Sequence, residues 1–294
     1  MGTAFLTMMD SRLSRKKKRM SRVFYRIFII VFCIVFLFSV FEITKIFLVR
    51  HDEKETMVHL TEIRGAVPEK PTVSSVEPYT EIKAEYPTEK KTDNLISKSE
   101  SNTQNRIQHH ENQQSVQNIF EMNSDCFGWI SISDTNISYP VMHTPYNSQK
   151  YLHRDFYGND SYSGVPFLDY RCCEQSDNLI VYGHHMNDGR IFSDLCNYTD
   201  RNYFDNHLEI LWENRKETAY FQVFAVAVVS CYDDWYLFTD ASTDEHYNAE
   251  IEYLMEKSLY HTENIPQNRQ QLLTLSTCTN ADEDGRIIVV AVKN

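Results

Sequence analysis

Beyond its first 26 residues the chain has few basic side chains relative to acidic ones. Those 26 residues hold eight lysines or arginines against one acid, Asp10, a net charge of +7. All 294 residues together carry a formal net charge of −12, so the rest of the chain carries −19. A surface of that sign repels nucleic acid phosphates, and the terminal basic cluster directly precedes an apolar run, where a membrane accounts for it. We therefore expect no nucleic acid partner.

The sequence also lacks the spacings typical of metal sites and of repeat proteins. No Cys-x-x-Cys or His-x-x-x-His pair completes a zinc site. The adjacent histidines His184 and His185 point apart in an extended chain, so they do not share one ion with Cys278. No internal repeat of fixed period is visible. We expect no metal ion and one folded domain.

The seven cysteines are an odd number, and Cys33 lies in the apolar run near the N-terminus. A domain of this size does not need disulfide bonds for stability, and many of the other six stand in apolar contexts that suit buried thiols. Disulfide bonds and free thiols both fit these contexts, and we expect at least one free thiol. The six are Cys126, Cys172, Cys173, Cys196, Cys231 and Cys278.

One long apolar segment lies near the N-terminus. Residues 27–41 are interrupted only by Ser39, and apolar residues continue at 46–49. A spanning helix needs about 20 apolar residues. A cleaved signal peptide is the alternative, but the run is long for one and no small-x-small cleavage site follows it. We expect a basic cytoplasmic tail at 1–22, an uncleaved transmembrane signal anchor at 23–49 and, by the positive-inside rule, the remaining chain outside the cell.

The chain after the anchor divides by composition. Residues 50–117 are polar and without a sustained period, which predicts a solvated stalk or linker, with short helices at 94–98 and 115–122 as the alternative. A folded domain is expected at 118–294, because short runs rich in β-branched or aromatic residues and bounded by Gly, Asn or Asp follow one another there. These predicted strands are 129–132, 137–141, 165–168, 178–182, 219–231, 271–276 and 286–292.

Two helices are predicted between the strands, so the domain is mainly β with a few peripheral helices. The first spans residues 243–260 and begins with a capping-box pattern at Ser242. The second follows Gly189, where Ile191, Phe192, Leu195 and Tyr198 are spaced for one helical face.

A cysteine and an arginine flank a predicted hairpin. The strand before Cys278 ends there, the polar residues 279–285 follow, and a second strand opens with Arg286. A hairpin would place these two side chains side by side at one rim of the sheet. A guanidinium beside a thiol favours the thiolate and offers donors to a developing oxyanion, as acyl transfer through cysteine requires.

A proton carrier would complete this group. The predicted strand 178–182 leads into His184 and His185, and histidine titrates nearest neutral pH. On these features alone, a cysteine that closes a buried strand is more often an inert core thiol, and a Gly-His-His step is usually a turn. The acidic residues Asp282, Glu283 and Asp284 are either orienting groups or simply a solvated turn.

Three motifs resemble the sortase family of cysteine transpeptidases. The segment TLSTC at 274–278 resembles the sortase signature Thr-Leu-x-Thr-Cys, Arg286 follows on the next strand, and YGH at 182–184 resembles the family's Gly-His element. The order His, Cys, Arg is the sortase order. The resemblance covers about residues 120–294, and the segments 127–130, 139–141 and 164–168 are similar to the opening strands of class B sortases. It implies a sortase-like β-barrel.

The resemblance also implies a reaction and a location. Cys278 attacks the carbonyl of the Thr-x bond in the C-terminal sorting signal of a surface protein and forms a thioester, which a cell-wall peptide precursor amine resolves. His184, with His185 as a substitute, transfers protons, and Arg286 holds the carbonyl oxygen. Ser276 and Thr277 line the substrate groove or serve as strand residues. No cofactor is needed, and the enzyme is a single-pass protein of the cell membrane with its catalytic domain outside.

Two alternatives remain at this point. A cysteine endopeptidase would hand the acyl group to water, although papain-like enzymes place Cys before His and this chain has the reverse order. A catalytically silent surface display protein would use the anchor, stalk and β domain without any chemistry at Cys278.

Overall fold

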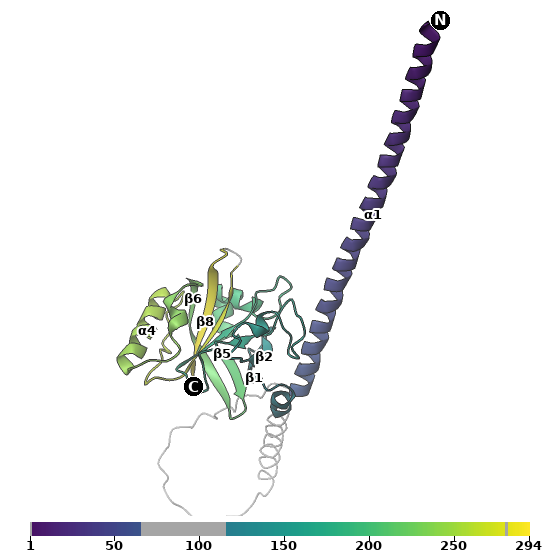
Figure 1. The fold of residues 1–294 in the computed structure, drawn as a ribbon. Coiled ribbons are helices and arrows are strands. Elements are labelled where there is room, and N and C mark those ends of the chain that lie inside the picture. Colours follow the sequence, from purple (N-terminus) through teal and green to yellow (C-terminus); the bar gives the residue numbers. More distant parts are fainter. Residues whose placement is uncertain (1, 66–115, 280–281) are drawn as a thin grey trace, which may run out of the picture. The chain divides into compact units, whose positions relative to one another are not determined.

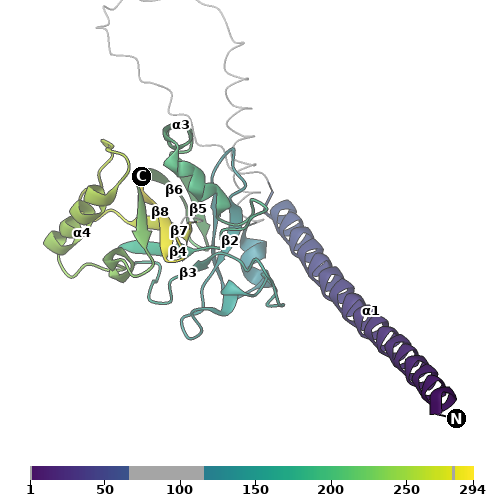
Figure 2. The same cartoon turned by 90° about the horizontal axis from the view of Figure 1, so that it is seen from above.

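The computed structural model describes residues 2–65, 116–279 and 282–294, with side chains from residue 24 onward. The chain forms two compact units, residues 1–52 and residues 53–294. Most of the predicted stalk, including residues 94–98, lies outside the described residues. Figure 1 shows the chain coloured along its sequence, and Figure 2 shows it from a second direction.

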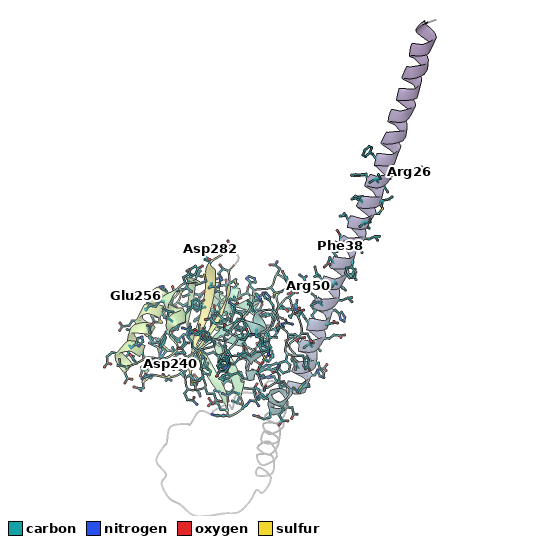
Figure 3. All side chains as sticks on the ribbon, viewed as in Figure 1. Arg26, Phe38, Arg50, Asp240, Glu256 and Asp282 are labelled. Carbon is teal, nitrogen blue, oxygen red and sulfur yellow. The ribbon has the colours of Figure 1, made fainter. Side chains whose placement is uncertain are left out.

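The first unit is the N-terminal part of the long helix α1 (Gly2–Arg64). The stretch Phe24–Arg64 includes an 18-residue window with a mean hydropathy of 2.8, and none of that window is buried. Arg26 and Phe38 point away from the helix axis (Figure 3). A helix of this length and hydropathy can cross a bilayer, so it is a candidate membrane anchor.

The second unit contains a closed barrel of eight strands in the order β1-β2-β3-β4-β7-β8-β6-β5. This confirms the predicted mainly β fold. The strands are β1 (Cys126–Ser131), β2 (Ser138–Met142), β3 (Phe167–Leu168), β4 (Asn178–Tyr182), β5 (Glu209–Asn214), β6 (Thr218–Ser230), β7 (Leu272–Cys278) and β8 (Gly285–Lys293).

Seven of these strands agree with the prediction to within a few residues, and β5 was missed. The apolar run of β5 is short. The next residue, Glu213, is only 3% exposed and forms an ion pair with Arg64. The strand therefore shows four consecutive buried positions and no alternation. A short run of this kind carries no period by which a strand is recognised.

The pairing of β4, β7 and β8 fixes where functional residues can gather. Strand β4 runs parallel to β7 with Tyr182 opposite Ser276, and β7 runs antiparallel to β8 with Cys278 opposite Arg286. Parallel strands end at the same edge of a sheet, and an antiparallel neighbour begins there. The residues that follow β4, end β7 and begin β8 therefore share one rim of the barrel.

Two helical segments flank the barrel. Helix α4 (Asp244–Lys257) confirms the predicted helix, and its N-cap residue Thr243 accepts a hydrogen bond from the His246 amide. After Gly189 the chain forms the 3₁₀ helix η2 (Ser193–Thr199) and the short helix α3 (Arg201–Asn206) instead of one α-helix. Buried Phe192, Leu195 and Tyr198 recur every three residues, which is the period of a 3₁₀ helix.

The remaining helical turns are short. They are η1 (Lys150–Leu152), η3 (Asp234–Leu237) and the helical residues 116–122. The last of these agrees with the alternative of a short helix at 115–122, of which residue 115 lies outside the described residues. All seven cysteines lie in the described parts of the chain and are free thiols.

The C-terminal part of α1 differs from the predicted solvated stalk. Residues 53–64 are helical and belong to the same compact unit as the barrel. Glu53, Leu60 and Arg64 are 6%, 0% and 1% exposed. Arg64 donates from Nε to Glu213 at 2.9 Å. A composition rich in charged residues predicts solvent exposure. That prediction is wrong for residues 53–64, because the charged side chains of Glu53 and Arg64 are buried against partners on the domain.

Candidate active site

Cys278 is the last residue of β7, and its side chain is exposed. The six residues before it in the strand are buried, so the strand is fixed up to the position where the thiol meets solvent. An exposed thiol at the end of a rigid strand is accessible to a substrate carbonyl without motion of the barrel. In contrast, burial raises the pKa of the Cys126 and Cys172 thiols to about 12.

Arg286 lies directly opposite Cys278 in the β7–β8 pair, as the hairpin pattern predicts. Its Nη1 donates to the backbone carbonyls of Glu283 at 3.0 Å and Gly285 at 2.8 Å. These two bonds tie one nitrogen of the guanidinium to its own turn. A guanidinium has five N–H donors, so others remain for a ligand.

His184 follows β4 and lies at the same rim. The Gly183 amide before it donates to the Ser276 carbonyl at 3.1 Å, which joins the end of β4 to β7. The ring nitrogen Nε2 is 2.9 Å from the Leu152 carbonyl oxygen. A carbonyl only accepts, so Nε2 carries a proton and the neutral ring offers Nδ1 for proton exchange.

The surroundings of His184 favour its neutral form. Burial lowers the pKa of the ring below its ordinary value, and the neighbouring His153 lowers it further, while the bond to Leu152 acts in the opposite direction. The His153 and His184 ring centroids are 5.7 Å apart. Desolvation disfavours a buried cation, and it is the largest of these effects.

His185, the other candidate, contacts the backbone of Cys278. Its Nδ1 is 3.0 Å from the Cys278 carbonyl oxygen and 3.5 Å from the Cys196 sulfur. The pKa of Cys196 is raised by burial and by the nearby Cys278. His185 therefore supports the main chain at the end of β7.

Ser276 and Thr277 are both 2% exposed, and their hydroxyls have protein partners. The Ser276 hydroxyl lies 2.7 Å from the Tyr236 hydroxyl, and the Thr277 hydroxyl donates to the Gly183 carbonyl at 2.7 Å. Both residues hold the β7 end in place. Their predicted contact with substrate stays a prediction.

Three acidic residues of the turn between β7 and β8 are exposed, namely Asp282, Glu283 and Asp284, and Asp282 is labelled in Figure 3. The Asp282 carboxylate accepts from the Asp284 amide at 3.3 Å, and Glu283 reaches Arg286 through its backbone carbonyl. Asp282, Glu283 and Asp284 are not among the described residues that line the cavity beside Cys278, which is given below. The turn therefore acts on Arg286 through its main chain.

One cavity of about 380 Å³ brings the five predicted site residues together. Cavities of several hundred Å³ with a few convergent polar groups are typical of ligand sites. Its lining residues are Ser148, Gln149, Leu152, Phe167, Asp169, Tyr170, Tyr182, Gly183, His184, Ser276, Thr277, Cys278 and Arg286.

Sequence reasoning missed a polar network in the wall of this cavity. Arg171 donates to both carboxylate oxygens of Asp169 at 2.8 Å, and the Tyr182 hydroxyl donates to the same carboxylate at 2.9 Å. Burial alone would raise the pKa of Asp169, but these bonds outweigh it and the pKa lies below its ordinary value. A DYR segment in a loop carries no motif, so only the fold reveals it.

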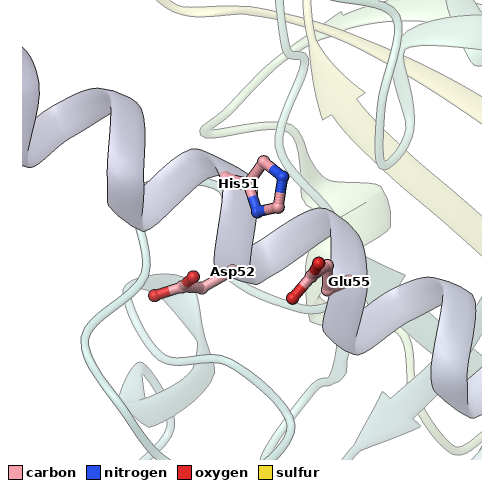
Figure 4. A group of neighbouring side chains, drawn as sticks. All are labelled: His51, Asp52 and Glu55. Carbon is pink, nitrogen blue, oxygen red and sulfur yellow. The ribbon is translucent and has the colours of Figure 1, made fainter.

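A second group of ionisable side chains lies on α1. His51, Asp52 and Glu55 are exposed, and atoms that could bind a metal ion lie within 4.8 Å of one another (Figure 4). Exposed acidic groups on one helix face are common without an ion, and we assign none to this one.

An exposed cysteine, a half-buried histidine and an arginine lie at one rim of a closed β-barrel. These are the groups that acyl transfer through cysteine requires. The sortase domain family model matches residues 130–294. The chain therefore belongs to the sortase family of cysteine transpeptidases, and its relatives make it class B-like.

Three relatives illustrate this. Staphylococcus aureus sortase B is 30% identical over 179 residues, which are 60% of this chain and 72% of that protein. A solved mutant form of Clostridium perfringens sortase B is 28% identical with a TM-score of 0.60, and the match covers 68% of this chain and 92% of that one. A Staphylococcus aureus sortase B–substrate complex is 28% identical with a TM-score of 0.59, covering 67% and 94%.

Proposed function

We propose that this protein cleaves a C-terminal sorting signal after Thr and transfers the surface protein that carries it to a cell-wall amine. The observation that carries the proposal is the convergence of Cys278, His184 and Arg286 on one cavity at the rim of the barrel. The existence of a sortase B–substrate complex among the relatives supports a peptide substrate. Hydrolysis by the same centre would make the protein an endopeptidase instead.

The first half-reaction forms a thioester. Neutral His184 first takes the thiol proton of Cys278, and the resulting thiolate attacks the Thr carbonyl carbon. Arg286 donates to the oxyanion of the tetrahedral intermediate. The C–N bond then breaks, and the leaving amine takes a proton from His184. The acyl group remains on the sulfur.

The second half-reaction releases the product. The acceptor amine attacks the thioester carbonyl, His184 takes a proton from the attacking nitrogen, and the C–S bond breaks to regenerate the thiolate. The neutral imidazole that burial favours is the form that accepts this proton. Residues of this chain therefore supply every proton transfer, with no bound cofactor.

We further propose that the apolar part of α1 anchors the enzyme in a membrane, and its length and hydropathy support this. Residues 23–49 span the bilayer, residues 1–22 stay in the cytoplasm because of their basic side chains, and the barrel lies outside the cell. In this proposal the catalytic unit extends from residue 53 rather than 118.

The function can be tested with the full chain in detergent micelles. Fluorogenic peptides of the Leu-Pro-x-Thr-Gly, Asn-Pro-x-Thr-Asn and Ser-Pro-x-Thr-Gly types are added with and without triglycine or hydroxylamine as the amine. The proposal predicts cleavage after Thr, a product that carries the added amine, and loss of both in Cys278→Ala. Cleavage indifferent to the amine would identify an endopeptidase. No cleavage of any peptide, together with a Cys278 that resists thiol alkylation, would identify a silent display protein.

A further inference from the structure

Glu53, on the C-terminal part of α1, has a buried carboxylate with several donors. Its Oε1 accepts from the Ser161 hydroxyl at 2.7 Å and from the Tyr162 amide at 2.6 Å. Its Oε2 accepts from the Ser163 hydroxyl at 2.8 Å and from Arg190 Nη1 at 3.1 Å. One carboxylate therefore joins α1 to two separate segments of the domain, the turn at 161–165 and the loop at 184–191.

This carboxylate is charged at neutral pH. Burial alone would raise the pKa of Glu53, but the bonds from Ser161, Ser163 and Arg190 outweigh it and the pKa lies below its ordinary value. Hydrogen bonds to an ionised group are about twice as strong as those between neutral groups. Loss of the charge therefore weakens all of these contacts at once.

The turn at 161–165 fixes the hydrogen-bond partner of His184. The carbonyls on either side of Leu152 accept from the Ser161 and Val165 amides, each at 3.1 Å. Gly164 has a φ of +60°, and a Cβ there would lie 2.5 Å from the Leu152 oxygen. The turn therefore packs directly on the carbonyl to which His184 donates.

The loop at 184–191 contains His184 itself. Arg190 reaches the Glu53 carboxylate at one end of the loop, and next to it Ile191 forms an isolated bridge with His185. The Phe192 amide donates to the His184 carbonyl at 3.0 Å. The backbone of His184 is thus tied to the residues beside Arg190.

We propose that Glu53 is a positioning residue for His184, because its carboxylate joins the loop that carries the imidazole to the turn that packs on the Leu152 carbonyl, the acceptor of the Nε2 hydrogen bond. The C-terminal part of α1 is then a structural component of the catalytic centre rather than a spacer. This inference rests on the proposed function, which gives His184 the proton transfers.

The test compares Glu53→Gln with Glu62→Gln in the full chain in detergent micelles. Both changes remove one charge from the same helix, but Glu62 is exposed. A small displacement of a catalytic group lowers the rate strongly. We therefore expect kcat of Glu53→Gln to fall by about tenfold or more, with KM nearly unchanged. Glu62→Gln should behave as the wild type in both constants.

A second readout does not depend on turnover. The ring signals of His184, followed by NMR of histidine-labelled protein, should shift in Glu53→Gln and stay fixed in Glu62→Gln. Ser163→Ala, which keeps the carboxylate and removes one of its donors, should show the same changes to a smaller degree. It therefore tests the inference if Glu53→Gln does not fold.

The outcomes separate the two proposals. Unchanged kcat and unchanged His184 signals in folded Glu53→Gln, or in folded Ser163→Ala if the first variant does not fold, would overturn the positioning role. If the wild type transfers no acyl group, the proposed function fails, and the NMR comparison still decides whether Glu53 positions His184.

Discussion

Cys278 and Arg286 are directly opposite each other in the antiparallel pair of β7 and β8. Cys278 is the last residue of β7, and Arg286, near the start of β8, lies beside it. Two backbone carbonyls of the turn, those of Glu283 and Gly285, hold the arginine. In the proposed function, the β-hairpin itself therefore brings together the nucleophile and the group that stabilises the oxyanion.

This arrangement predicts that Arg286→Ala lowers kcat by about a hundredfold or more, the usual effect of losing one oxyanion donor. Arg286→Lys should retain part of the activity, because it keeps the charge and loses the planar fork of donors. Steady-state kinetics of both variants with a cleaved peptide measures this. Wild-type kcat in Arg286→Ala would exclude the arginine from the transition state.

The lowered pKa of His184 predicts a dependence of stability on pH. The unfolded ring titrates near its ordinary value of 6.5 and the folded ring titrates below it. Between those two values the unfolded state binds more protons, so the contribution of His184 to stability is full above pH 6.5 and is lost as the pH falls through the folded pKa.

The measurement is the thermal midpoint of wild type and His184→Gln at pH 7 and pH 5. We expect the wild type to lose more stability than the variant on acidification, because only the wild type has the His184 ring with its lowered pKa. The other histidines are the same in both proteins, so their contributions cancel in the comparison. Equal losses would contradict a depressed pKa at His184.

Burial predicts which cysteines react with iodoacetamide at neutral pH. Cys278 is exposed, whereas Cys126 and Cys172 are 1% and 2% exposed, each with a pKa of about 12. The thiolate is the reactive form, so peptide mapping should find Cys278 alkylated long before these two. Modification of Cys126 as fast as Cys278 would contradict the burial shown here.

Substitution of Gly183 by alanine tests how tightly the backbone before His184 is packed. A Cβ at Gly183 would lie 2.6 Å from Cδ2 of the buried Phe192 ring, and a Cβ at Gly128 would lie 2.7 Å from the Trp212 ring. Overpacking costs about 1–3 kcal/mol, so both Ala variants should lose stability by similar amounts in chemical denaturation.

Their activities should differ. Gly183→Ala displaces the residue next to His184 and should lower kcat, while Gly128→Ala lies on β1 and should keep it. Equal kcat values in the two folded variants would show that the backbone at residue 183 does not set the position of the imidazole.

Much of the fold and of the candidate site is predictable from sequence because it rests on local patterns. The runs ending at Tyr182 and Cys278 are β-rich and bounded by polar residues, so strand ends and their functional side chains are visible together. The hairpin between Cys278 and Arg286 needs only a short polar connection. The parallel pairing of β4 with β7 involves residues about a hundred positions apart, so only the family resemblance places His184 at the same rim.

Other features depend on partners distant in the sequence, so no local pattern predicts them. Glu53 lies in a polar stretch, and nothing near it shows that Ser161 and Ser163 bind its carboxylate. Asp169 lies in a loop without a motif, and Arg171 and Tyr182 become its partners only in the folded barrel. Long-range pairing of polar groups therefore marks the limit of what the sequence predicts.

The most direct test of the account is the detection of the acyl-enzyme. The full chain is mixed with a peptide that it cleaves, quenched in acid, and analysed by intact mass and peptide mapping. The account predicts one adduct with the mass of the peptide up to its Thr, located on Cys278, which decays faster when an amine is added. Cleavage without any adduct, or an adduct on another residue, would contradict a thioester at Cys278.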